Sequence, residues 1–179
     1  GMPLATALGE DNLECLENKV NKKTAKYWNK IKNIGGICPK VQPEDIAFIG
    51  LRDLESQEIA MVNRLNLLSI EVDEFRQKGF EKVVLELEDK FSNCDEIYVS
   101  FDVDSMDPNV VSHGTGTPVD DGLFPEEAKV ILNYFAAHPK VKCIEFVEVN
   151  PCLDEKTNRM AEVAYELIQE VVKTIEEKR

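Results

Sequence analysis

Residues 98–108 read Tyr-Val-Ser-Phe-Asp-Val-Asp-Ser-Met-Asp-Pro, and residues 114–118 read Gly-Thr-Gly-Thr-Pro. An apolar run therefore leads into two carboxylates, Asp102 and Asp104, and a loop rich in glycine and proline follows. Side chains alternate between the two faces of a strand, so we expect both aspartates to point the same way. Such a pair suits a hard divalent cation such as magnesium, calcium or manganese. The alternative is a pair of solvated or capping acids.

The loop that follows the aspartates is predicted to close over them. Gly114 and Gly116 permit positive φ, which lets a chain fold back tightly. Thr115 and Thr117 are able to hydrogen-bond either a ligand or the loop itself. His113 lies in the same loop, where both a proton-transfer role and a purely structural role remain open.

Apolar runs that indicate strands alternate with segments of helical periodicity along most of the chain. The expected strands are residues 46–51, 67–72, 97–101 and 142–149, and the expected helices are residues 56–65, 80–91, 125–137 and 161–175. This alternation predicts an α/β fold with three αβα layers, in which about four strands form a mostly parallel sheet.

The length of 179 residues suits a single domain covering residues 1–179. Residues 10–44 fit the alternation least well, since they are rich in lysine and asparagine and contain Gly35-Gly36, Pro39 and Pro43. We expect this segment to be a loop-rich insertion or connector.

The overall charge and the cysteines exclude several classes of protein. A net charge of −13 argues against binding to nucleic acid or to an anionic membrane surface. No apolar run is long enough to span a membrane. The five cysteines are odd in number and form no C-x-x-C pair, which favours a reduced, cytoplasmic protein.

Polar residues follow three of the expected strands, in the clusters 52–58, 102–117 and 148–151. Ligands of parallel sheets bind beyond the carboxyl ends of the strands, so we expect the clusters to converge there. Glu148 ends an otherwise apolar strand, and its carboxylate could bind a guanidinium group with two hydrogen bonds. A strand-end surface acid is the alternative interpretation, and Glu145 is a second acid on the same strand.

The motifs taken together resemble those of the arginase (ureohydrolase) family. They are Ser100-Phe101-Asp102-Val103-Asp104 with Asp107-Pro108, Thr115-Gly116-Thr117-Pro118, Gly122-Leu123, Glu148-Val149-Asn150-Pro151 and Ile49-Gly50-Leu51-Arg52-Asp53. Gly1-Met2-Pro3 with Leu8-Gly9 resembles the segment that follows the arginase histidine in H-G-M-P, a feature that favours arginase over agmatinase.

The resemblance implies a hydrolase with two manganese ions that splits L-arginine, or a related guanidino compound, into ornithine and urea. It implies that Asp102 and Asp104 are metal ligands and that Glu148 grips the guanidinium group. Glu55, Glu58 and Thr117 are the further substrate-binding candidates, with Glu55 standing where the family usually has aspartate.

The family's G-G-D-H and D-A-H-x-D metal motifs and its catalytic histidine have no counterpart in this sequence. The chain therefore resembles the C-terminal half of an arginase, and no catalytic residue is assigned. Two carboxylates cannot fill two six-coordinate shells, so we expect weak or partial manganese binding. We also expect an unpaired apolar strand edge, which leads to homo-oligomers unless the N-terminal segment buries it.

Three hypotheses about function remain after these comparisons of motifs. The first is an arginase-family hydrolase with metal at Asp102 and Asp104. The second is a catalytically inactive fragment that acts as a binding or assembly module. The third is another ureohydrolase, such as agmatinase or formiminoglutamase. Urea release from arginine with added manganese separates the first hypothesis from the second.

Overall fold

The computed structural model describes residues 2–155 and 158–178. It divides into two compact units, one made of Gly1–Phe48 with Asp53–Ser69 and the other of Ile49–Arg52 with Ile70–Arg179. Each unit has a hydrophobic cluster of its own. Among the described residues, no helix combines the length and the apolar character that crossing a bilayer requires.

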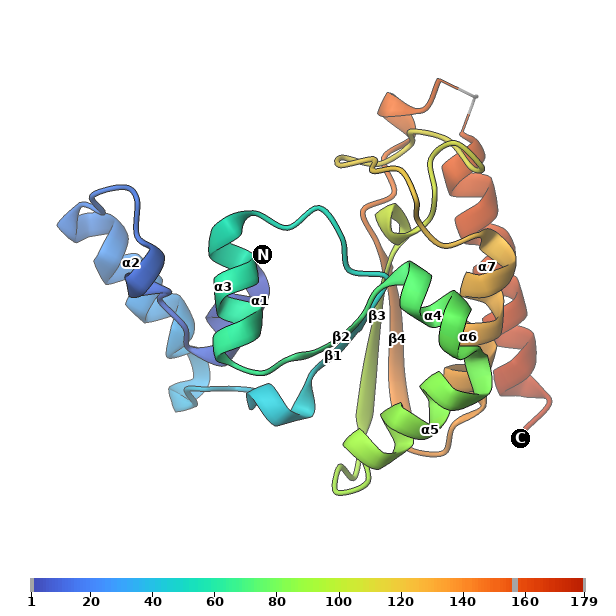
Figure 1. Cartoon of the computed structure of the whole chain (residues 1–179), viewed down its shortest axis with the longest axis horizontal. Helices are drawn as coiled ribbons and strands as arrows, with labels where there is room; N and C mark the ends of the chain where they lie inside the picture. Colours follow the sequence, from blue (N-terminus) through green and yellow to red (C-terminus); the bar gives the residue numbers. More distant parts are fainter. Residues whose placement is uncertain (1, 156–157, 179) are drawn as a thin grey trace. The chain divides into compact units, whose positions relative to one another are not determined.

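Helices and strands alternate along the chain as the sequence predicts (Figure 1). In order they are α1 (Met2–Leu8), α2 (Lys22–Lys32), β1 (Ala47–Ile49), α3 (Ser56–Arg64), β2 (Leu68–Ile70), α4 (Val72–Lys78), α5 (Phe80–Lys90), β3 (Ile97–Asp102), α6 (Pro125–Ala137), β4 (Val141–Val147) and α7 (Arg159–Glu176). The predicted fold class, a partial three-layer α/β arrangement with parallel strands flanked by helices, is confirmed.

The second unit is built on the parallel pair β3–β4, in which Ser100 lies opposite Glu145. Alternate residues of β3 are buried or half-buried against α6 and α7, so that Phe101 and Val103 join Leu132 and Leu167 in one core. Figure 1 shows both helices beside this strand pair. The packing leaves the carboxyl ends of β3 and β4 next to each other, where the loops of interest begin.

Two local signals in the sequence set the start of helices. Pro125 opens α6, and the Glu127 side chain accepts a hydrogen bond from the Phe124 N–H at 2.8 Å. The N-cap of α3 is Glu55, and the Glu58 side chain accepts a hydrogen bond from the Glu55 N–H at 3.1 Å.

The strands pair differently from the single sheet that the sequence predicts. The described strands form two sheets of two strands each, β1 with β2 and β3 with β4. In a single four-strand sheet, one of the two pairs would have to hydrogen-bond to an edge strand of the other. Strand periodicity predicts that a run is a strand, but it does not predict which strand lies beside it. The number and the placement of the strand runs along the chain agree with the prediction.

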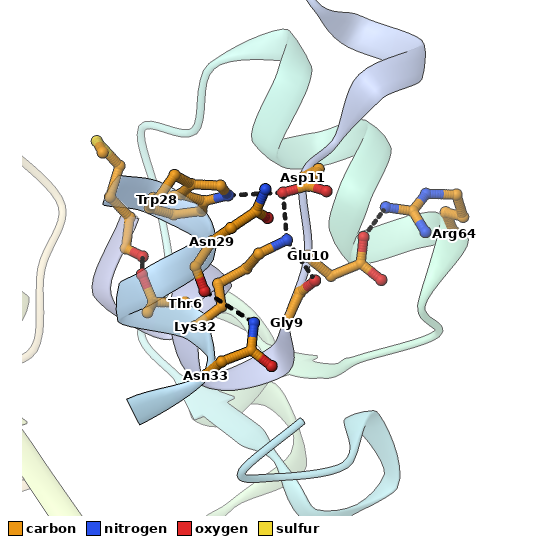
Figure 2. A network of polar contacts seen from close by, with 10 residues as sticks. Thr6, Gly9, Glu10, Asp11, Trp28, Asn29, Lys32, Asn33 and Arg64 are labelled. Atoms are coloured by element: carbon orange, nitrogen blue, oxygen red, sulfur yellow. Dashed lines mark hydrogen bonds and ion pairs between the residues drawn. The ribbon is translucent and has the colours of Figure 1, made fainter. Parts of the chain in front are cut away.

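The segment 10–44, predicted to be loop-rich, contains the helix α2 of eleven residues together with short 3₁₀ turns. The sequence did not predict this helix because lysines occupy most of its turns and few apolar residues mark a helical period. Asp11 fixes the helix from within its own unit: Asp11 Oδ1 accepts from Trp28 Nε1 at 2.6 Å and from Lys32 Nζ at 2.5 Å (Figure 2). Lys32 is consequently buried although it is charged.

Candidate metal and guanidinium site

The two aspartates of the opening motif lie at the junction of a strand and a tight turn. Strand β3 ends at Asp102, and Val103–Ser105 form a 3₁₀ turn. Asp102 Oδ1 accepts a hydrogen bond from the Asp104 N–H at 3.1 Å. Strand alternation therefore does not set the direction of Asp104, contrary to the prediction. The turn and its capping bond keep the two residues close instead.

Residues from two further segments join the aspartates. Thr117 Oγ1 donates to Asp104 Oδ2 at 2.7 Å. Glu148 follows β4 directly, and an added Cβ on Gly116 would lie 3.6 Å from Glu148 Oε2. The second unit thus brings together Asp102, Asp104, Thr117 and Glu148, all four of them candidates from the sequence.

Glu148 is held in an unusual backbone conformation, with φ of 64°. The left-handed region disfavours a residue with a long side chain, and such strain persists only where surrounding contacts impose it. One such contact is the hydrogen bond from the Asn150 N–H to the Gly114 carbonyl, at 2.8 Å. The strain marks this strand exit as a place where side-chain direction matters more than local stability.

Gly114 is required for space and not for positive φ as predicted. Neither Gly114 nor Gly116 is among the glycines with positive φ. A Cβ on Gly114 would lie 2.6 Å from both Asp154 Oδ2 and Met160 Cβ. Asp154 Oδ2 also accepts from Ser112 Oγ and from the Met160 N–H, each at 2.8 Å. This carboxylate ties the loop to the start of α7, a role that the sequence analysis missed.

Arg52 is the largest contributor to the site that sequence reasoning did not identify. Its guanidinium donates to the carbonyl oxygens of Asp104 at 2.6 Å and Val119 at 2.7 Å. Longer bonds, of 3.2–3.3 Å, reach the carbonyls of Gly50, Ser105, Met106 and Asp120. A single cation therefore joins the turn after β3 to the loop at residues 119–120. The sequence places Arg52 in the strand-end cluster 52–58 and in the Ile49–Asp53 motif, but neither signal indicates its carbonyl partners.

The carboxylates make the site electrostatically unfavourable when no cation is bound. Burial, helped by the negative charges of Asp104 and Glu148, raises the pKa of Asp102 to about 7, against the opposing effect of the hydrogen bond from the Asp104 N–H. A carboxyl group whose pKa is raised in this way gains most from a nearby positive charge. The charge of this cluster of acids is of the sign that attracts a metal ion or a guanidinium group.

The site offers the type of ligand atom that a hard metal ion prefers, but too few such ligands. Asp102 and Asp104 offer carboxylate oxygens, yet the described residues contain no group of three or more His, Cys, Asp or Glu that could hold a metal. The buried hydroxyl of Thr115 has no hydrogen-bond partner among the described residues.

Comparison with known proteins identifies the origin of this arrangement. The sequence model of the Arginase family matches residues 12–173. The chain belongs to the arginase family. Arginase of Bacillus subtilis is 31% identical over 96% of this chain, and arginase of Brevibacillus brevis is 34% identical over the same share. In each case the match covers 52% of the relative, so the chain spans about half the length of these arginases.

Solved structures agree with this assignment at the level of the fold. The crystal structure of Bacillus subtilis arginase superposes with a TM-score of 0.78 at 32% identity, covering 95% of this chain and 53% of that protein. Helicobacter pylori arginase gives a TM-score of 0.86 at 24% identity, covering 98% and 57%. The arginase fold therefore accounts for nearly the whole chain.

Glu55 and Glu58, the other two candidates from the arginase motifs, belong to the first unit. There they stand at the N-terminal turn of α3, where Glu58 caps the helix through the bond to the Glu55 N–H described above. His113 pairs through Nδ1 with Glu155 Oε1 at 2.8 Å, and both side chains are about half exposed. These contacts give Glu58 and His113 local structural partners.

Replacing Arg52 with methionine removes all of its hydrogen bonds while keeping a side chain of similar length. We expect Arg52→Met to lower the free energy of unfolding by about 2–4 kcal/mol, because several part-buried carbonyls lose their donor. Arg64→Met is the matched control, since Arg64 pairs with Glu10 in a solvent-exposed ion pair and should cost at most about 1 kcal/mol. Urea denaturation measures both. Equal losses would show that Arg52 does not organise the loops.

Asp102→Asn removes a carboxyl group whose pKa is raised to about 7. Between its unfolded pKa and about 7 the folded state binds more protons, so the group lowers stability as pH rises. Because Asp102 is half-buried, we expect the variant to gain on the order of 1–2 kcal/mol at pH 8 and nothing at pH 4. Thermal unfolding with chelator present measures this. An equal gain at both values would contradict the assigned pKa.

Proposed function

We propose that this chain carries the metal-facing and guanidinium-facing wall of an arginase-type hydrolase, which splits L-arginine into ornithine and urea. The observation that supports it is the junction of β3 and β4, where Asp102, Asp104, Thr117 and Glu148 meet as the arginase motifs require. Because the chain spans about half of its relatives, the activity of those longer proteins is part of the proposal.

Asp102 and Asp104 are the proposed ligands of the manganese ions. When bound, the metal pair supplies a water-derived nucleophile and positive charge near the carbon that reacts. Thr117 orients Asp104 through its hydrogen bond. With two carboxylates as donors, we expect manganese to bind weakly and to keep several waters.

Glu148 is the proposed partner of the guanidinium group. A carboxylate matches the fork of a guanidinium with two parallel hydrogen bonds, and the strained backbone at this residue fixes where the carboxylate points. Glu55 and Glu58 are the proposed partners of the substrate's α-amino group. A reduced, cytoplasmic setting is proposed as well, since the five cysteines are all free.

A second candidate function is that of a binding or assembly module without catalysis. The absence of any three-residue metal group among the described residues favours it. We also propose self-association, since β3 has β4 as its one strand partner within the described part of the chain. Formimidoylglutamase of Bacillus subtilis and proclavaminate amidino hydrolase share the fold at 24% and 23% identity, which gives no support for their substrates here.

Release of urea from L-arginine in the presence of manganese tests the proposed activity. The purified chain is incubated with millimolar manganese and arginine, and with agmatine or formiminoglutamate in parallel reactions. Urea formed from arginine above the rate with chelator supports the hydrolase. Arginine that binds without being hydrolysed supports the binding module, and preference for another substrate would contradict the arginine assignment.

Glu148→Gln keeps the shape of the side chain and removes its charge. We expect arginine to bind about 10–100-fold more weakly, because a charge-assisted hydrogen bond is worth roughly 1.5–3 kcal/mol. Manganese affinity should change little. Glu145→Gln is the control on the same strand, where Glu145 accepts from Ser100 Oγ at 2.7 Å. Calorimetric titration with each ligand checks this, and equal weakening in both variants would remove Glu148 from the site.

A further inference from the structure

Helix α2 presents a basic and apolar surface that nothing in its own unit covers. Residues 18–40 contain seven lysines and no acidic residue, in a chain of net charge −13. Tyr27 and Ile31 are 53% and 47% exposed on this helix. Together with Lys23 and Trp28 of the same helix and Met2 of α1, they line a shallow groove. We call Lys23, Lys30, Tyr27 and Ile31 the α2 face.

The α2 face is rigid because the opposite side of the helix is anchored. Trp28 and Lys32 bind Asp11, and Lys32 Nζ also donates to the Gly9 carbonyl at 3.3 Å (Figure 2). Helical geometry of 3.6 residues per turn places Lys23, Tyr27 and Lys30 on the side away from Lys32, with Ile31 next to them on the flank. Within the described residues, Lys23 and Lys30 make no ion pair. Ordered apolar side chains and unpaired charges on one side of a helix are typical of a binding surface.

Helix α7 carries a surface of complementary character in the other unit. Its buried side packs into the core, and Glu170 pairs with Lys129 of α6 at 3.2 Å. On another side, Tyr165, Ile168 and Val172 recur at intervals of three and four residues and are 60%, 36% and 46% exposed. Glu162 and Glu166 stand near this stripe, and each pairs with Arg159 at 3.4 Å. We call these five residues the α7 face.

We propose that the α2 face of one chain docks on the α7 face of a second copy of the same chain. Each face combines exposed apolar side chains with charges, and the charges are opposite in sign. Charge complementarity of this kind steers association and fixes the register of the contact. A second copy supplies the acidic surface that a lysine-rich helix needs, because the rest of this chain is more acidic than the whole.

A symmetric dimer would make this contact twice. In such a pair, α2 of each chain meets α7 of the other, so two small helix contacts add. The proposal does not depend on hydrolase activity. It also differs from pairing at the free edge of β3, which would bury backbone groups and respond little to salt.

Charge reversal on the two faces gives a test with a clear signature. Variant A is Lys23→Glu with Lys30→Glu, and variant B is Glu162→Lys with Glu166→Lys. Each alone places like charges on both faces, so we expect monomers by size-exclusion chromatography with light scattering. An equimolar mixture of A and B should restore the dimer, because both contacts again join opposite charges. The unaltered chain should dimerise at 50 mM salt and dissociate at least tenfold more readily at 500 mM.

Controls separate this contact from misfolding and from other occupants. Lys82→Glu with Lys90→Glu on α5 makes the same charge change and should leave the dimer intact. Tyr27→Ser with Ile31→Ser keeps the lysines and should still give a monomer. Circular dichroism checks that each variant is folded.

A monomeric unaltered chain, or a mixture of A and B that stays monomeric, would overturn the proposal. So would a monomeric unaltered chain that sediments with phosphatidylserine vesicles when variant A does not, because the α2 face would then bind lipid.

Discussion

The guanidinium of Arg52 holds the loops of the site in place, and the other site residues depend on it. Within the described residues it contacts no carboxylate. It donates to backbone carbonyls of the turn after β3, at residues 104–106, and of the loop at residues 119–120. Carbonyl groups at a strand exit have no ladder partner, and a buried one without a donor is costly. A planar group with five N–H donors satisfies several such carbonyls at once, which lysine could not do. The turn containing Asp104 is therefore fixed before any ligand arrives.

That rigid frame explains how acidic side chains can stand together without collapsing or separating. Repulsion among Asp102, Asp104 and Glu148 is opposed by bonds that have nothing to do with a ligand: the cap from Asp104 N–H, the hydroxyl of Thr117 and the loop tie at Asp154. Holding the acids together costs free energy, which is visible in the raised pKa of Asp102 and in the left-handed backbone of Glu148. Strain and repulsion of this kind are typical of sites that recognise a cation.

Much of this could be predicted from the sequence, because the signals were local. The strand runs, the proline that opens α6, and the carboxylates after β3 all follow from periodicity and from side-chain type. Arg52 and Asp154 could not be predicted, since their partners are backbone groups and residues about 40–70 positions away. The role of Gly114 was misjudged for the same reason: the neighbours that require a glycine come from α7. The pairing of the four strands in one sheet was not predicted correctly, because periodicity indicates which residues are buried and not which strands are neighbours.

The acids of the site and the lysines of α2 are both clusters of like charge. Charge that is segregated in a chain must be balanced locally by bonds, as at Asp11 and Lys32, or by something that binds. At the carboxyl ends of β3 and β4 no ion pair joins a cationic side chain to these carboxylates within the described residues, and the raised pKa of Asp102 reflects that imbalance. On the α2 face the lysines are equally unbalanced, and the acids of α7 are of the right sign and carry apolar neighbours. The surplus of acid over base in the whole chain makes another copy an effective partner for that one basic helix.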